Sequence, residues 1–320
     1  MSKLARIRNK SLLLLITGIL VLSVGFIFIS CGEDPQLKVA ESDNGPFAID
    51  LSLAPAPLGV FFAVNKNFPS IAGKELTVEA WVKSKTSSLS GGIIGRNDGK
   101  GIVLFVNNNE PKLGIMRTPV PPETTGCSQI NATSTECIVD SNVSLVQDLW
   151  THVAGVLTSE NQSSGPDGCS TIGSQNPHLA IYVNGVLQNC ASTGSLFTED
   201  PTGDILAVGV IGDAGPAIDK GKVSGGIRFD GVIDEVRVWT VARSKAQIQA
   251  CMGQELSFAV TGDCYMDPSI LKGYWRFNEG DGSASTDFSG AWGTGAVEGP
   301  PTLAWSGAWV QGAPIVRDSE

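Results

Sequence analysis

The sequence predicts an all-β protein, a two-sheet antiparallel sandwich with one short helix. The first observation is alternation in residues 76–83, where apolar side chains occupy every second position and therefore lie on one face of a strand. These alternating residues are Leu76, Val78, Ala80 and Val82. The second observation is that many short segments of this kind are separated by turn-forming residues, which is typical of sandwiches. The other strand candidates are Ile102–Val106, Leu113–Arg117, Trp150–Leu157, Leu179–Val183, Val186–Gln188, Ile205–Ile211, Gly231–Trp239 and Leu271–Phe277.

Two local signals identify a hairpin and the helix. Asn184-Gly185 separates two strand candidates, and both central residues of a type I′ turn need positive φ, which Asn and Gly tolerate. Ser244 followed by Gln247 forms a capping-box pattern, so we expect a helix over Lys245–Met252. Its apolar residues are expected to plug one end of the sandwich.

The first thirty residues are typical of a bacterial lipoprotein signal peptide. Basic residues precede the apolar run Leu12–Ile29, and the small residue Ser30 stands before Cys31. We expect cleavage after Ser30 and acylation of Cys31, with two or more acyl chains giving stable anchoring. The alternative is an uncleaved anchor, because the run approaches the roughly 20 residues that cross a bilayer. In both cases the folded part lies outside the membrane.

The predicted organisation follows the chain from this signal. Residues 1–30 form the signal peptide, the polar residues 31–46 a flexible tether, 47–314 a single folded domain, and 315–320 a tail. This organisation predicts a lipid-anchored protein of the bacterial cell envelope, at the outer membrane or cell surface.

The charge balance excludes some partners. The chain has 22 Lys plus Arg and 32 Asp plus Glu. Removing residues 1–30 takes away four basic residues, so 18 basic face 32 acidic residues and the formal charge is −14. This balance argues against nucleic acid or an anionic membrane surface as a partner, which leaves the N-terminal lipid as the membrane contact.

The cysteines predict disulfides. Seven cysteines become six once Cys31 is acylated, an even number in an exported chain. Loop closure costs least between near neighbours, which favours Cys127–Cys137, Cys169–Cys190 and Cys251–Cys264 over the other pairings; buried free thiols are the alternative. The segments 119–142 and 159–177 are long, polar and cysteine-bearing, and we expect these loops to shape a binding edge or to be plain surface decoration.

Five segments resemble the laminin-G-like, concanavalin A-like lectin-glucanase jelly-roll family, in the family's order. They are LTVEAWVK (Leu76–Lys83), IIGRNDGKGIVLFV (Ile93–Val106), LWTHVAGVL (Leu149–Leu157), LAIYVNGVL (Leu179–Leu187) and FDGVIDEVRVWTVARSKAQI (Phe229–Ile248). The resemblance implies a jelly-roll sandwich. Gly273–Gly295 is similar to a segment that often opens a further jelly roll in this family. Since few residues follow it, we expect 273–314 to complete the only sandwich; the alternative is a vestigial repeat, disordered after about Gly282.

The same resemblance implies a structural Ca²⁺ as cofactor. In related lectins and glucanases an Asp in the strand matching residues 229–239 often holds this ion, and Asp234 occupies that position. Asp287 is a second candidate ligand, because Ca²⁺ prefers oxygen donors. The alternative for Asp234 is a carboxylate that accepts turn amides or pairs with Arg237.

Nothing in the sequence nominates catalytic residues. His152 is expected to be packed or hydrogen-bonded in the interior, and His178 belongs to no motif. The ExDxE strand of jelly-roll glucanases, whose carboxylates share one cleft, is absent. Asp234 and Glu235 are neighbours, which predicts opposite faces of a strand and excludes an acid–nucleophile pair.

Seven tryptophans are candidates for contact with sugar rings. We expect Trp81, Trp150, Trp239 and Trp275, in strands that match the family's core positions, to be packing residues. Trp292, Trp305 and Trp309 stand in Gly-rich sequence and are the candidate ligand-binding residues, although packing over an open end of the sandwich is the alternative.

These observations favour a non-catalytic envelope module. It is expected to recognise carbohydrate, or a glycosylated or matrix partner, in adhesion. The first alternative is a structural or scaffolding lipoprotein that binds another protein. The second is a divergent glycan hydrolase or lyase. Fold resemblance alone does not separate them.

Overall fold

The computed structural model describes parts of residues 47–316, all within one compact unit, Asn44–Glu320. The signal peptide, Cys31 and the tether lie outside the described residues, as does most of the two long loops. Within the described part of the chain, no helix has the length and apolar character needed to cross a bilayer. The described ranges are 47–52, 61–67, 75–96, 101–116, 136–158, 169, 177–193, 205–211, 227–259, 261–282, 284–289, 295–298 and 309–316.

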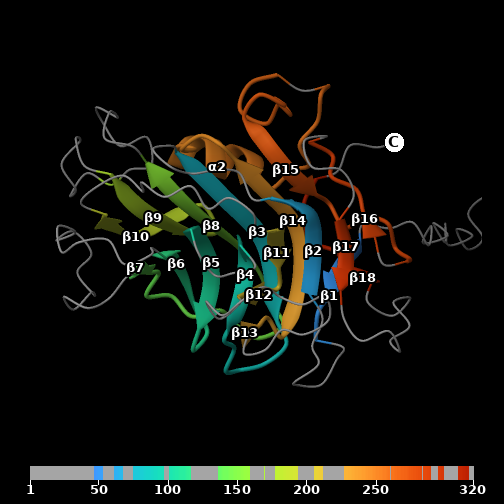
Figure 1. Ribbon diagram of the computed structural model, residues 1–320, viewed down its shortest axis with the longest axis horizontal. Helices are drawn as coiled ribbons and strands as arrows, with labels where there is room; N and C mark the ends of the chain where they lie inside the picture. The colour runs from blue at the N-terminus through green and yellow to red at the C-terminus, as the bar shows by residue number, and fades with distance from the viewer. Residues whose placement is uncertain are drawn as a thin grey trace, which may run out of the picture. The chain divides into compact units, whose positions relative to one another are not determined.

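Two eight-stranded antiparallel sheets form the fold (Figure 1). The first sheet has the order β10-β9-β8-β3-β14-β1-β18, and β15 also pairs with β14. Its strands are β10 (Val186–Ser192), β9 (His178–Val183), β8 (Trp150–Thr158), β3 (Leu76–Ser84), β14 (Gly231–Trp239), β1 (Phe47–Asp50), β18 (Trp309–Gln311) and β15 (Leu271–Trp275).

The second sheet has the order β16-β17-β2-β11-β4-β5-β6-β7. Its strands are β16 (Ala284–Ser285), β17 (Gly295–Glu298), β2 (Phe61–Asn67), β11 (Ile205–Val208), β4 (Gly91–Arg96), β5 (Gly101–Asn107), β6 (Glu110–Met116) and β7 (Glu136–Asp140). A separate pair joins β12 (Val210–Ile211) to β13 (Ile227–Arg228). The all-β sandwich predicted from the sequence is confirmed. The predicted loop 119–142 differs at its end, because residues 136–140 pair with β6 as strand β7.

The main apolar core lies between the two sheets. The four alternating residues of β3 all belong to this cluster, together with Ile93 and Leu104 of the second sheet. Leu76, Val78 and Val82 are fully buried, as the period of two predicts. Burial of such side chains contributes roughly 25 cal/mol per Å² of apolar area, so this layer holds the two sheets together.

The outer face of the first sheet is also buried. Helix α2 (Lys245–Cys251) lies over it, where Ile248 packs with Ala154 and Tyr182 rather than with the main core (Figure 1). The prediction that this helix plugs one end of the sandwich is therefore wrong. We call residues 245–266, which run from α2 to Met266, the covering segment.

The local signals for the helix and the hairpin are confirmed. Ser244 accepts a hydrogen bond from Gln247 N, and the Gln247 side chain accepts one from Ser244 N, which completes the capping box. Asn184 and Gly185 have φ of +49° and +70°. A Cβ on Gly185 would stand 2.8 Å from Gln249 Cγ, so glycine also allows α2 to approach the hairpin.

The C-terminal strands join both sheets. β15 pairs with β14, β17 pairs with β2 and β16, and β18 pairs with β1. Residues beyond Gly282 thus contribute strands to the sandwich, as expected for a segment that completes it.

Two of the three predicted disulfides are present, Cys169–Cys190 and Cys251–Cys264. Cys137 is also disulfide-bonded, and its predicted partner Cys127 lies outside the described residues. The Cys251–Cys264 bond closes the covering segment on itself, and both cysteines are buried.

Candidate functional site

A β-bulge in β14 sets the geometry of the outer face. Asp234 pairs with Trp81 of β3, and Arg237 pairs with Glu79, so β14 has one residue more than β3 between these pairs. Glu235 takes up the extra residue with φ of +53°, a conformation that is uncommon for a residue with a side chain.

The bulge changes which side chains share a face. Ile233 and Val236 both belong to the core, so the two residues between them lie on the other side. Asp234 and Glu235 are therefore on one face, and the prediction of opposite faces is wrong. Both carboxylates are almost completely buried in the described structure, with exposures of 0% and 1%, and both are engaged by protein groups.

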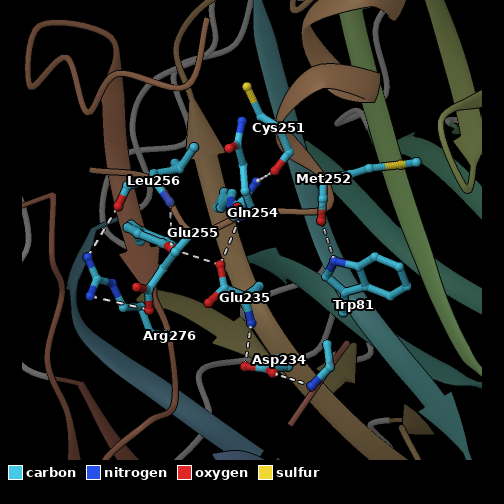
Figure 2. Close-up of polar contacts among 12 residues, drawn as sticks. Trp81, Asp234, Glu235, Cys251, Met252, Gln254, Glu255, Leu256 and Arg276 are labelled. Atoms are coloured by element: carbon cyan, nitrogen blue, oxygen red, sulfur yellow. Dashed lines mark hydrogen bonds and ion pairs between the residues drawn. The ribbon is translucent and has the colours of Figure 1, made fainter. Parts of the chain in front are cut away.

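The Asp234 carboxylate accepts hydrogen bonds from backbone amides. Its Oδ1 accepts from Glu235 N at 2.8 Å and its Oδ2 from Ala313 N at 2.7 Å (Figure 2). It therefore joins the bulge to the C-terminal residues that follow β18. This is the turn-amide role that the sequence offered as the alternative, while Arg237 pairs with Glu235 instead.

Asp287 has a similar role. Its Oδ1 accepts from Tyr274 N and Ser289 N, both at 2.9 Å, and its Oδ2 accepts from the Ser289 hydroxyl at 2.9 Å. No group of three or more His, Cys, Asp or Glu side chains that could hold a metal occurs among the residues that the structure describes. The N–H and O–H groups that donate to Asp234 and Asp287 occupy carboxylate oxygens that a Ca²⁺ ion would need as ligands. Ca²⁺ binding therefore stays a prediction.

Arg237 fastens the covering segment to the sheet. Its Nη1 donates to Cys251 O at 2.9 Å, and its Nη2 donates to Gln254 O at 2.7 Å and to Glu235 Oε2 at 2.8 Å. The Tyr274 hydroxyl also donates to Glu235 Oε2, at 2.7 Å, and accepts from Leu256 N. Burial alone would lower the pKa of Arg237, but the negative partners raise it above the usual range, so the guanidinium is charged.

The carboxylate of Glu79 supplies a second negative charge beside the Arg237 guanidinium, at 3.8 Å. Burial favours the protonated acid, yet a hydrogen bond from His152 and the charges of Arg237 and Arg243 hold its pKa at about 2. His152 Nε2 is 3.4 Å from Glu79 Oε2, and Trp239 Nε1 donates to Glu79 Oε1 at 2.9 Å. Glu79 is therefore ionised at neutral pH although it is buried.

A second arginine, Arg243, also holds the covering segment. Its Nη2 donates to Asp263 O at 2.9 Å and contacts Cys251 Sγ at 3.2 Å, while its guanidinium carbon stands 4.1 Å from the centre of the Trp239 ring. Burial lowers its pKa below the usual value. Arg243 thus contacts both ends of the disulfide-closed loop.

Three further contacts complete the attachment (Figure 2). Trp81 Nε1 donates to Met252 O at 2.7 Å, and Arg276 donates to Leu256 O at 3.2 Å. Arg276 also pairs with Glu255 at 3.3 Å. Side chains of the first sheet therefore hold the backbone at four positions, Cys251, Met252, Gln254 and Leu256.

The histidines are internal. His152, 1% exposed, lies edge-on to Trp81 with ring centres 5.5 Å apart, and His178 contacts the Thr158 hydroxyl at 2.9 Å. The expectation that His152 is a packed interior residue is confirmed. His152 contacts the Glu79 carboxylate, which also accepts a hydrogen bond from Trp239. These contacts form a buried packing arrangement and include no nucleophile.

The tryptophans differ from expectation at two positions. Trp309 is buried in the main core, with Nε1 donating to Gly282 O at 2.9 Å, so its expected exposure as a ligand-binding residue is wrong. The reason is pairing of β18 with β1, which turns Gly-rich sequence into a strand. Trp150 is partly exposed, with Lys83 Nζ 4.8 Å from its ring centre, rather than packed in the core. Trp292 and Trp305 lie outside the described residues.

Sequence reasoning missed an exposed aromatic pair on the covering segment. Phe258 and Tyr265 are 58% and 39% exposed, and their ring centres lie 6.2 Å apart in an edge-on arrangement. Neither residue stands in a recognisable motif. A disulfide that brings Tyr265 back toward the 251–258 stretch was the available signal.

A family model described as the concanavalin A-like lectin/glucanases superfamily matches residues 62–249, more than half of the chain. The chain belongs to this superfamily. The match spans strands of both sheets and most of α2, and ends within the covering segment. Among curated proteins, none matches the sequence at a significant level.

One solved structure is similar to this chain in fold. A candidate carbohydrate-binding protein from Bacteroides ovatus has a TM-score of 0.50 at 19% identity, over 79% of this chain and 58% of that chain. The chain thus spans little more than half the length of the Bacteroides protein.

Two more distant structures are a heptameric SAP-like pentraxin from Limulus polyphemus and the CBM40 domain of a Ruminococcus gnavus IT-sialidase, bound to α2,3-sialyllactose. The pentraxin has a TM-score of 0.40 at 18% identity, over 64% of this chain and 81% of its own. The CBM40 domain has a TM-score of 0.39 at 15% identity, over 56% and 83%. These low TM-scores bear on neither the site nor the function of this chain.

Proposed function

We propose that the protein is a lipid-anchored, non-catalytic module of the bacterial cell envelope that binds carbohydrate, either free or carried by a glycosylated or matrix partner. The observation that carries the proposal is membership of the lectin/glucanases superfamily. The shared fold of the Bacteroides candidate carbohydrate-binding protein supports the same class of ligand.

The buried carboxylates support binding without catalysis. A glycosidase needs two carboxyl groups that a substrate can reach. Asp234 and Glu235, the adjacent acidic pair of β14, are buried and hydrogen-bonded to protein groups. This pair serves folding instead of chemistry.

A glycan array tests the binding. The full-length protein, solubilised in detergent, is expected to bind a subset of glycans reversibly and to release no product from them. Silence on the array together with a protein partner recovered by crosslinking would favour the scaffold alternative. Product release that a single carboxylate substitution abolishes would favour a hydrolase or lyase.

The anchor is tested separately. Mass spectrometry of the mature protein is expected to find an N-terminal Cys31 carrying acyl chains, and Cys31→Ala to leave the signal uncleaved. An unmodified cysteine on the mature chain would contradict the lipoprotein assignment and leave carbohydrate binding untouched.

A further inference from the structure

Exposed apolar side chains gather around the covering segment. Six large apolar residues are exposed in the described part of the chain, and three of them are Phe258, Tyr265 and Val316. Phe258 and Tyr265 belong to the covering segment, and Val316 forms a parallel bridge with Gln254 of the same segment. Gathered exposed apolar side chains mark an interaction surface, whereas scattered ones are ordinary.

The two aromatic rings stand on an ordered support. Ser257 and Tyr265 form a bridge, and Met266 N donates to Ser257 O at 3.2 Å, so the stretches that carry the rings lie side by side. The Cys251–Cys264 bond joins the two stretches, Arg237 of β14 holds Gln254 O, and Arg243 holds Asp263 O. Aromatic side chains on an ordered support lose little conformational entropy on binding.

A carboxylate belongs to the same turn as one of the rings. Exposure alternates along residues 263–266: Asp263 and Tyr265 are exposed, while Cys264 and Met266 are 6% and 4% exposed. Asp263 and Tyr265 belong to one turn, in which Tyr265 N donates to Gly262 O at 3.3 Å, so this turn presents both side chains to solvent. Gln247 Nε2 donates to Asp263 Oδ1 at 3.1 Å and steadies this carboxylate.

We propose that Phe258, Tyr265 and Asp263 form a sugar-binding site for neutral pyranose residues of a glycan. A pyranose has an apolar C–H face, which loses water on an aromatic ring, and hydroxyl groups at its rim, which donate to a carboxylate. The acidic chain, with a net charge of −10 before any cleavage, disfavours anionic sugars. This inference rests on the carbohydrate binding proposed above.

Titration of full-length protein in detergent with a neutral oligosaccharide selected on the array tests the site. We expect Phe258→Ala and Tyr265→Ala each to weaken Kd about tenfold or more, as truncation of a central aromatic contact does. Asp263→Asn is expected to weaken binding less, and Tyr265→Phe to retain it. Leu149→Ala is the matched control, because Leu149 is also exposed, at 55%, and does not belong to the covering segment, so its loss should leave Kd unchanged.

The outcomes separate the site from the function. If wild type binds neutral glycans and all variants bind equally well, this site is overturned while carbohydrate binding stands. If wild type binds only sialylated or uronate glycans, the ligand class is overturned. If wild type binds no glycan, both proposals fail. Unchanged thermal melting of the alanine variants excludes unfolding as the cause of a lost affinity, and retained binding by Tyr265→Phe does so independently.

Discussion

The two faces of the first sheet are both buried, but by different means. The inner face packs apolar residues such as Val78 and Ile233 against the second sheet. The outer face carries Glu79 and Arg237, which pair at 3.8 Å. Glu79 also accepts a hydrogen bond from Trp239, and Arg237 donates to the backbone of the covering segment. Apolar packing tolerates many sequences, whereas a buried charge requires its partner in place. The inner face therefore builds the fold, and the outer face positions one particular segment.

Removing Arg237 is expected to cause the largest loss. Arg237→Met leaves Glu235 and Glu79 without their main cation and frees two backbone carbonyls of the covering segment, so unfolding free energy should fall by about 3–5 kcal/mol. Denaturant titration measures this. Lys245→Met, at an exposed helix position, is the control. A loss as small as that of the control would show that the outer face contributes little.

A core truncation on the inner face gives the matching measurement. Leu76 is fully buried, and Leu76→Ala is expected to cost about 2–5 kcal/mol through lost transfer energy and the remaining cavity. Both variants should also be probed by hydrogen exchange. We expect Arg237→Met to raise exchange most in residues 245–266, and Leu76→Ala to raise it across both sheets. Identical exchange patterns would contradict the difference between the faces.

The outer face, which carries the buried carboxylate of Glu79, should lose stability in acid, whereas the apolar inner face should not. The pKa of Glu79 is about 2 in the folded protein, against 4.5 for an ordinary Glu. The unfolded chain therefore binds this proton first, and the stabilising contribution of Glu79 is full above pH 4.5 and lost as pH falls toward 2. Glu79→Gln is expected to flatten the pH dependence of stability in that window. Parallel curves for the variant and wild type would rule out this role.

The smallest expected effect lies at the start of α2. Ser244→Ala removes the capping hydroxyl that Gln247 N contacts, and unfolding free energy should fall by about 1 kcal/mol. Chemical denaturation measures the change, with Lys245→Ala as a control that leaves the cap intact. A Ser244→Ala protein as stable as wild type would show that tertiary contacts alone hold the helix in place.

Local patterns in the sequence predicted the strands, the hairpin and the capped helix, because alternation and capping act between near neighbours. The bulge at Glu235 escaped prediction, since its positive φ depends on pairing with β3 rather than on any glycine. The burial of the outer face was not predicted either, because it depends on a contact between β14 and a segment later in the chain. Glu79 and Arg237 occupy positions that alternate with apolar residues, a pattern that predicts exposed side chains. Both side chains are buried because the covering segment lies above them.

Pairing of β1 with β18 brings residues from the two ends of the folded domain into register, with Phe47 opposite Gln311. Since β1 also pairs with β14, only its other edge lacks a neighbour until β18 has left the ribosome. Such distant pairing makes folding slow, because a long loop must close before the contact forms. The first sheet can therefore reach its final strand order only after synthesis of residues 309–311.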